Sequence, residues 1–241
     1  MNLLIDIGNS QTKIATGDGK KINVLESVSS PGLIDFRKLK EKFTASDKCI
    51  LVSSGAIPDG LYRLLMKKFS LFIELTHKTL LPIEIGYETK DTLGMDRVAS
   101  AVGAQYQFPG KNLLIIDAGT AMTIDMITKE GIFAGGNISP GIEMRLKALN
   151  QFTDKLPLVH FRDDYTLLGT STEMAIRSGV LNGVIFEVQG YINALQNKYK
   201  SLTVVLTGGD AEFFGKTLKS SIFVDFNLIF AGLNRILDYN I

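Results

Sequence analysis

An internal repeat constrains the fold of this 241-residue chain more than any other feature of its sequence. Residues 3–12 read LLIDIGNSQT and residues 114–123 read LIIDAGTAMT. Each copy is an apolar run that leads into Asp-x-Gly, with a small polar residue next and a threonine further on. Asp6 and Asp117 occupy the same place in the two copies and lie nearly half a chain apart. Such an offset favours two similar domains over one large domain.

Each copy of the repeat continues as a β-hairpin rather than as a helix. Residues 12–16 and 122–127 alternate apolar and polar side chains, and each run leads to a glycine-containing turn. Apolar residues at helical spacing predict helices over residues 34–43, 61–69, 97–107, 141–152 and 171–198. Strands that alternate with helices indicate the α/β class. We therefore expect domains at residues 1–111 and 112–241, with the last helix able to pack back on the first domain.

Composition argues against several classes of function. The 26 Lys and Arg balance 25 Asp and Glu, which leaves no basic footprint for nucleic acid. The single cysteine, Cys49, lies in an apolar run and is read as a buried strand residue rather than as a nucleophile. No apolar run reaches the length of about 20 residues that spans a membrane, and the N-terminus lacks a signal-peptide pattern. We expect a cytoplasmic protein without nucleic-acid or membrane partners.

Both Asp-x-Gly loops have the chemistry of a phosphate-binding turn. Glycine lets backbone N–H groups approach an anion closely, and successive N–H groups form an anion-binding concavity. Lys13 adds a cation, and hydroxyl donors come from Ser10, Thr12, Thr120 and Thr123. The two aspartates would repel phosphate, so they are better suited to hold a cation or its waters. A single Asp-x-Gly is common at strand ends, but two matched copies indicate function.

The segment at residues 94–97, Gly-Met-Asp-Arg, stands at the start of a predicted helix. Asp96 is a candidate base for a hydroxyl group, and Arg97 is a candidate bidentate contact for a carboxylate. A preference for charge at a helix N-terminus is the structural alternative.

Four further segments carry glycine or small polar residues whose role can be structural or functional. Gly208 and Gly209 follow a β-branched strand, either as a tight strand–helix junction or as a platform for a nucleoside. Residues 135–141 shape a loop or line a cleft, and the hydroxyls of residues 170–172 are explained by helix capping alone. Gly179 and Gly183 in the long predicted helix indicate close packing in a core or at a subunit interface.

Together these motifs resemble the type III pantothenate kinase family. They follow the family order and span nearly the whole chain, as residues 6–13 (DIGNSQTK), 94–97 (GMDR), 117–123 (DAGTAMT), 135–141 (GGNISPG), 169–179 (GTSTEMAIRSG) and 207–211 (TGGDA). The paired aspartate loops are shared with the wider superfamily of acetate and sugar kinases, heat-shock chaperones and actin. The Gly-x-Asp-Arg and Thr-Gly-Gly-Asp-Ala elements make the resemblance narrower.

The resemblance implies two ribonuclease H-like domains, each a mixed sheet flanked by helices, with an ATP cleft between them. It also implies a homodimer that phosphorylates pantothenate to 4′-phosphopantothenate, the first step of coenzyme A biosynthesis. Asp96 matches the catalytic base and Asp117 matches a ligand of a monovalent cation, K⁺ or NH₄⁺, while Mg²⁺ accompanies ATP near Asp6.

Further site residues are carried over by position. The matching ATP contacts are Asp6, Ile7, Gly8, Asn9, Ser10, Gln11, Thr12, Lys13, Thr120, Gly208 and Gly209. The matching pantothenate contacts are Tyr87, Gly94, Met95, Asp96, Arg97 and Thr172. Ser10 replaces a frequent threonine and keeps the hydroxyl, and Met95 replaces a smaller residue. The alternatives are another small-molecule kinase of the superfamily, whose chains are generally longer, and a non-enzymatic ATP-binding regulatory or assembly protein.

Overall fold

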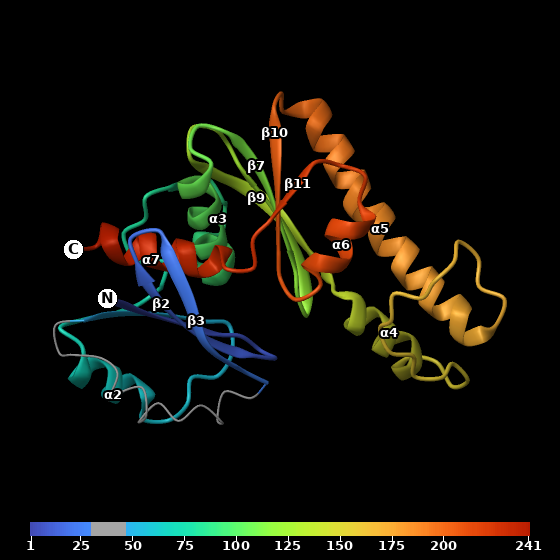
Figure 1. Cartoon of the computed structure of the whole chain (residues 1–241), viewed down its shortest axis with the longest axis horizontal. Helices are drawn as coiled ribbons and strands as arrows, with labels where there is room; N and C mark the ends of the chain where they lie inside the picture. The colour runs from blue at the N-terminus through green and yellow to red at the C-terminus, as the bar shows by residue number, and fades with distance from the viewer. Residues whose placement is uncertain (30–46) are drawn as a thin grey trace. The chain divides into compact units, whose positions relative to one another are not determined.

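A computed structural model describes residues 1–29 and 47–241 of the chain (Figure 1). The predicted helix over residues 34–43 lies outside these residues. The chain divides into two compact units, each described here by itself. Unit 1 contains residues 1–110, 127–135 and 227–241, and unit 2 contains residues 111–126 and 136–226. The domain boundary expected between residues 111 and 112 stays a prediction.

The first sheet has the strand order β3-β2-β1-β4-β5. Its centre is β1 (Asn2–Ile7), which pairs antiparallel with β2 (Thr12–Asp18) and parallel with β4 (Lys48–Ser53). The outer strands are β3 (Lys21–Val28) and β5 (Leu71–Glu74). Cys49 is fully buried in β4, where burial raises the pKa of its thiol, so the expected structural role of this residue is confirmed.

The second sheet repeats this order and adds one strand. It runs β11-β10-β7-β8-β9-β6, where β7, β8, β9, β10 and β11 take the places of β1, β2, β3, β4 and β5. The bounds are β7 Asn112–Ala118, β8 Ala121–Ile127, β9 Ile132–Pro140, β10 Leu202–Thr207, β11 Ile222–Val224 and β6 Glu84–Ile85. The sequence repeat is therefore a structural repeat, and the predicted α/β class with two mixed sheets flanked by helices is confirmed.

The predicted helices within the described residues are present. They are α2 (Leu61–Lys68), α3 (Met95–Gln107), α4 (Ile142–Gln151) and α5 (Thr172–Lys198). The described residues also contain α6 (Ala211–Thr217), α7 (Leu228–Tyr239) and the short 3₁₀ turn at Lys90–Thr92. In the described part of the chain, no helix has the length and apolar character that crossing a membrane requires.

The last helix, α7, packs in unit 1 against α3 and against strands of the first sheet (Figure 1). Two glycines allow α3 and α7 to touch at their backbones. A Cβ atom on Gly232 would lie 1.8 Å from the carbonyl oxygen of Ala99, and one on Gly103 would lie 2.2 Å from that of Leu228. Larger side chains would separate the two helices, so these glycines serve packing rather than ligand binding.

Candidate functional site

The first Asp-x-Gly loop is a tight turn between β1 and β2. The backbone N–H of Gly8 donates to the carbonyl oxygen of Gln11 at 2.8 Å, and the N–H groups of Ser54 and Gly55 donate to that of Ile7. A Cβ atom on Gly8 would lie 3.0 Å from the Gln11 oxygen, and one on Gly55 would lie 3.0 Å from the Gly8 oxygen. Glycine at these two positions lets the loop and the end of β4 lie against each other.

The residues predicted for ATP phosphates in this loop differ in exposure. Asn9, Ser10 and Gln11 are exposed at the tip. Ile7 and Thr12 are fully buried, so the side chains of these two residues do not reach the exposed tip of the loop. The Thr12 hydroxyl has no hydrogen-bond partner among the described residues.

At the ends of the strands that flank this loop, Asp6 and Lys13 are direct cross-strand partners in the β1–β2 register. Both are partly exposed. The strand pairing therefore places one acidic and one basic group side by side where the loop begins.

The second Asp-x-Gly loop has the same position between β7 and β8. The Gly141 N–H donates to the carbonyl oxygen of Thr120 at 3.1 Å. A Cβ atom on Gly141 would lie 2.2 Å from the Gly119 oxygen, so the segment 135–141 ends against this turn. The interpretation of this segment as a loop is wrong, because residues 135–140 are the second part of strand β9. Thr120 is exposed and Asp117 is partly buried.

Parallel pairing of β10 with β7 brings the Thr-Gly-Gly-Asp segment to the same loop, with Thr207 opposite Asp117. Gly208 has φ +95°, in the left-handed region that glycine tolerates. A Cβ atom there would lie 2.5 Å from both the Ala118 carbonyl oxygen and Asp117 Oδ1. This crowding excludes a side chain and leaves a carboxylate and a carbonyl oxygen together. Oxygen donors of this kind suit a hard cation.

Asp210, to which the sequence assigned no role, closes this cluster. Its backbone N–H donates to the Ala118 carbonyl oxygen at 2.9 Å, which fastens the start of α6 to the end of β7. Partial burial raises the pKa of the Asp210 carboxyl, and the negative charge of Glu143 raises it further. Gly209 differs from the crowded Gly208, because a Cβ atom on Gly209 would have no neighbour within 4 Å.

At the start of α3, Asp96 accepts a hydrogen bond through Oδ1 from the backbone N–H of Arg97, at 2.8 Å. Gly94 is needed beside it, because a Cβ atom there would lie 2.5 Å from the same carboxylate oxygen. The predicted base is therefore held at one oxygen by the first turn of its own helix. Met95 precedes it in that turn and is partly exposed.

The side chain of Arg97 is almost buried, with 7% of its surface exposed. Its guanidinium carbon lies 5.8 Å from the ring centre of Tyr87 and 5.7 Å from that of Phe133. Both distances are within the range of cation–π attraction. The structure thus brings two of the predicted pantothenate contacts, Tyr87 and Arg97, together in unit 1. Sequence reasoning missed Phe133, which lies far from both in the chain.

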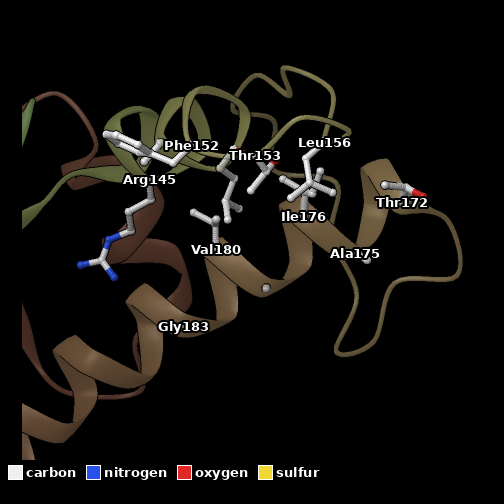
Figure 2. Close-up of a pocket in the computed structure, with 12 residues that line it drawn as sticks. Arg145, Phe152, Thr153, Leu156, Thr172, Ala175, Ile176, Val180 and Gly183 are labelled. Atoms are coloured by element: carbon white, nitrogen blue, oxygen red, sulfur yellow. Dashed lines mark hydrogen bonds between the residues drawn. The ribbon is translucent and has the colours of Figure 1, made fainter.

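Thr172 is the first residue of α5 and is exposed, while Ser171 caps the helix by accepting from the Met174 N–H at 3.2 Å. The predicted capping role of this segment is confirmed for Ser171. Thr172 also borders an open groove of about 670 Å³ between α4 and α5 (Figure 2). Its apolar wall includes Leu149, Ile176 and Val180.

Two of the small residues on α5, Gly179 and Gly183, form the floor of this groove. A Cβ atom on either glycine would have no neighbour within 4 Å. The interpretation that they pack closely inside a core is therefore wrong, because the surrounding space is open. The other interpretation, a subunit interface, is not contradicted.

The predicted residues fall into two groups by unit. Unit 1 holds residues 6–13, Tyr87 and residues 94–97, and unit 2 holds Asp117, Thr120, Thr172, Gly208 and Gly209. Each distance given above is between two residues of the same unit.

Comparison with known proteins identifies a family. The sequence profile of the family described as type III pantothenate kinase matches residues 2–194. The type III pantothenate kinase of Phocaeicola vulgatus is 47% identical over 246 residues, covering 100% of this chain and 99% of that protein. The corresponding protein of Cytophaga hutchinsonii is 44% identical, with 100% of both chains covered.

Solved structures show the same fold. A structure from Campylobacter jejuni, described as belonging to the Baf family of transcriptional activators, has a TM-score of 0.63 and 25% identity, covering 99% of this chain and 98% of that one. A glucokinase from an Antarctic psychrotroph has a TM-score of 0.52 and 12% identity, covering 99% and 98%. The second likeness is one of fold alone.

Proposed function

We propose, because the chain belongs to the type III pantothenate kinase family, that it transfers the γ-phosphoryl group of ATP to the primary hydroxyl of pantothenate. The product, 4′-phosphopantothenate, enters coenzyme A biosynthesis. The observation that carries the proposal is the Asp96–Arg97 pair, with one group for a hydroxyl proton and another for a carboxylate. Pantothenate carries both of these groups.

The transfer needs mainly positioning and charge neutralisation, because the transition state of phosphoryl transfer is loose. In our proposal the exposed tip of the first loop and Lys13 hold the phosphates, and Gly208 and Gly209 contact the adenosine. The open space above Gly209 supports such a contact. Mg²⁺ neutralises phosphate charge when bound with ATP, and Asp6 is the residue that would hold it or its waters.

Asp96 orients the attacking hydroxyl and accepts its proton as the new P–O bond forms and the bond to ADP breaks. The hydrogen bond from the Arg97 N–H to Oδ1 fixes the orientation of the Asp96 carboxylate. In our proposal the other carboxylate oxygen, Oδ2, contacts the substrate hydroxyl. Arg97 binds the carboxylate of pantothenate in a bidentate manner. Tyr87, Gly94, Met95 and Thr172 complete the proposed substrate contacts.

A monovalent cation, K⁺ or NH₄⁺, is part of this proposal. Its support is the pair of oxygens beside Gly208, one from the Asp117 carboxylate and one from the Ala118 carbonyl. One carboxylate with carbonyl oxygens gives a low negative charge, which suits a large monovalent ion. Thr120, a proposed ATP contact, lies in the same loop as Asp117. A cation bound at Asp117 would therefore lie near the ATP phosphates and offset part of their negative charge.

We also propose a homodimer that forms through the exposed face of α5. Between residues 175 and 190, the exposed positions of this helix are Ala175, Gly179, Gly183, Phe186 and Gly190. Surface helices ordinarily place charged residues on such a face, so a stripe without any charge indicates a covered surface. This surface has a groove beside Gly179 and Gly183 and an exposed Phe186 ring next to it. In a twofold dimer the same surface of both subunits meets, so a ring of one subunit could fill the groove of the other.

A cytoplasmic location is part of the proposal, since the proposed phosphoryl donor, ATP, is a cytoplasmic metabolite.

The test of the function is a substrate panel with the purified protein, ATP, Mg²⁺ and K⁺. We expect ADP release with pantothenate at least 100-fold faster than with acetate, glucose or no acceptor. Turnover with a sugar or acetate instead would assign the chain to another kinase of the superfamily. ATP-dependent sedimentation without acceptor turnover would indicate an assembly protein.

A further inference from the structure

Phe133 is a fully buried aromatic residue that touches two proposed substrate contacts. Its ring centre lies 5.7 Å from the guanidinium carbon of Arg97 and 6.2 Å from the ring centre of Tyr87. The Tyr87 and Phe133 rings meet edge to face, at an interplanar angle of 72°. Arg97 contacts both rings, so the three side chains form one cluster within unit 1.

Backbone pairing between β6 and β9 determines where Tyr87 and Phe133 lie relative to each other. β6 pairs parallel with the start of β9, and Ile85 lies opposite Phe133. The Gly86 N–H donates to the Phe133 carbonyl oxygen at 3.0 Å, and a Cβ atom on Gly86 would lie only 3.1 Å from that oxygen. This close approach leads the chain directly into Tyr87 and sets its ring beside Phe133.

The two rings restrict an otherwise flexible side chain. A free arginine loses rotamer entropy when it binds a ligand, whereas one already held in place loses less. Arg97 is only 7% exposed, and a cation over a ring is held more strongly when it is removed from water. A guanidinium fixed in this way can present its planar fork to a carboxylate in one orientation.

We propose that Phe133 is a positioning residue that sets specificity for a carboxylate-bearing substrate by holding Arg97 and Tyr87 in the binding orientation. The inference rests on the proposed role of Arg97 as the contact for the pantothenate carboxylate. Phe133 itself, being fully buried, acts through its two neighbours.

The test compares Phe133→Leu with the wild type on two acceptors. One is pantothenate, and the other is the analogue in which a hydroxymethyl group replaces the carboxylate. We expect the KM for pantothenate to rise about tenfold, with kcat and the KM for ATP within about twofold of wild type. For the alcohol analogue we expect kcat/KM to change by less than about twofold, because Arg97 has no carboxylate to bind.

Phe230→Leu is the matched control, since Phe230 is a buried phenylalanine of α7 in the same unit. We expect it to lower thermal stability without changing the preference for acid over alcohol. A second variant replaces the Phe133 residue by 3,4,5-trifluorophenylalanine, which keeps the ring but withdraws negative charge from its face. A rise in the pantothenate KM for this variant would separate cation–π positioning from packing, even where Phe133→Leu failed to fold.

Equal losses for the acid and the alcohol in Phe133→Leu, or unchanged kinetics in the fluorinated variant, would overturn the inference. Arg97→Gln distinguishes this result from failure of the proposed site. If Arg97→Gln removes the preference for the acid but the Phe133 variants do not, only the role of Phe133 is wrong. If Arg97→Gln leaves the preference intact, the carboxylate assignment of Arg97 is wrong, and the inference falls with it.

Discussion

At the scale of single residues, Asp96 and Arg97 are adjacent in sequence, but their side chains contact different parts of the structure. The Asp96 carboxylate is tied to the first turn of α3, and the Arg97 guanidinium lies against two aromatic rings. Neighbouring residues on a helix point in different directions, so one short segment can address two ends of a substrate. This division explains why the four-residue segment carries more functional information than either Asp-x-Gly loop alone.

Asp96→Asn tests the proposed base at this scale. The amide keeps an oxygen that can accept from the Arg97 N–H, so we expect the melting temperature to stay within about 2 °C of wild type. Because the amide cannot take up the hydroxyl proton, we expect kcat to fall by about 10²-fold or more while the KM for ATP changes little. Steady-state kinetics and a thermal melt give both values.

Asp91→Asn supplies the comparison, because Asp91 is an exposed carboxylate of the same unit, 85% accessible at its side chain. It should keep wild-type turnover. A folded Asp96→Asn enzyme with near-native kcat would show that another group accepts the proton.

At the scale of elements, a partly buried polar network joins β1, near the start of the chain, to α7, near its end, within unit 1. Asn2 Nδ2, on β1, donates to Asn234 Oδ1 of α7 at 2.8 Å and to Asp238 Oδ1 at 3.1 Å. Asn234 Nδ2 in turn donates to the Gly19 carbonyl oxygen at 2.8 Å. One asparagine thus fastens α7 to both the first strand and the turn of the β2–β3 hairpin.

We expect Asn234→Ala to lower the free energy of unfolding by about 1–2 kcal/mol, because it removes the hydrogen bonds of Asn234 with Asn2 and with the Gly19 carbonyl oxygen, while Asn2 keeps its bond to Asp238. Asn234 itself is only 3% exposed. Urea denaturation followed by circular dichroism measures the change. The exposed Asn23 of β3 is the control, and Asn23→Ala should change stability by less than about 0.5 kcal/mol. Equal effects of the two substitutions would contradict the network.

The face of α5 makes a prediction about association. Gly183→Glu places a charge on the uncharged stripe, and the open space there lets the helix itself accommodate the new side chain. We expect light scattering at about 10 μM to show a dimer for wild type and a monomer for the variant, because a buried unpaired carboxylate disfavours the interface. Gln196→Glu adds the same charge on the same helix outside the stripe and should leave the dimer intact. A monomeric wild type would contradict the proposed interface.

At the scale of the whole molecule, the repeat predicted much of the architecture. Asp6 and Asp117 are the last but one residues of the equivalent strands β1 and β7, and both sheets share one strand order around them. The helix expected at residues 61–69 was recognisable from its periodicity, as were those at 97–107, 141–152 and 171–198. Hairpins and amphipathic helices are local patterns, which is why residue spacing revealed them.

Long-range pairings had no such local signal. Phe133 joins the Arg97 cluster through the short parallel pairing of β6 with β9, and two residues of β6 are too few to show a pattern. The contact of α7 with α3 depends on single glycines, Gly103 and Gly232, far apart in the chain. The open surroundings of Gly179 and Gly183 were also invisible, since a small residue fits a tight contact and an empty groove equally well.

The central claim is tested most directly by the product of the wild-type protein with ATP, Mg²⁺ and pantothenate, analysed by mass spectrometry in K⁺, NH₄⁺ and Na⁺ buffers. We predict a pantothenate species heavier by one phosphoryl group, formed in equal amount to ADP. We expect its rate to be about tenfold or more higher in K⁺ or NH₄⁺ than in Na⁺. ATP hydrolysis without phosphorylated pantothenate in every buffer would contradict the account.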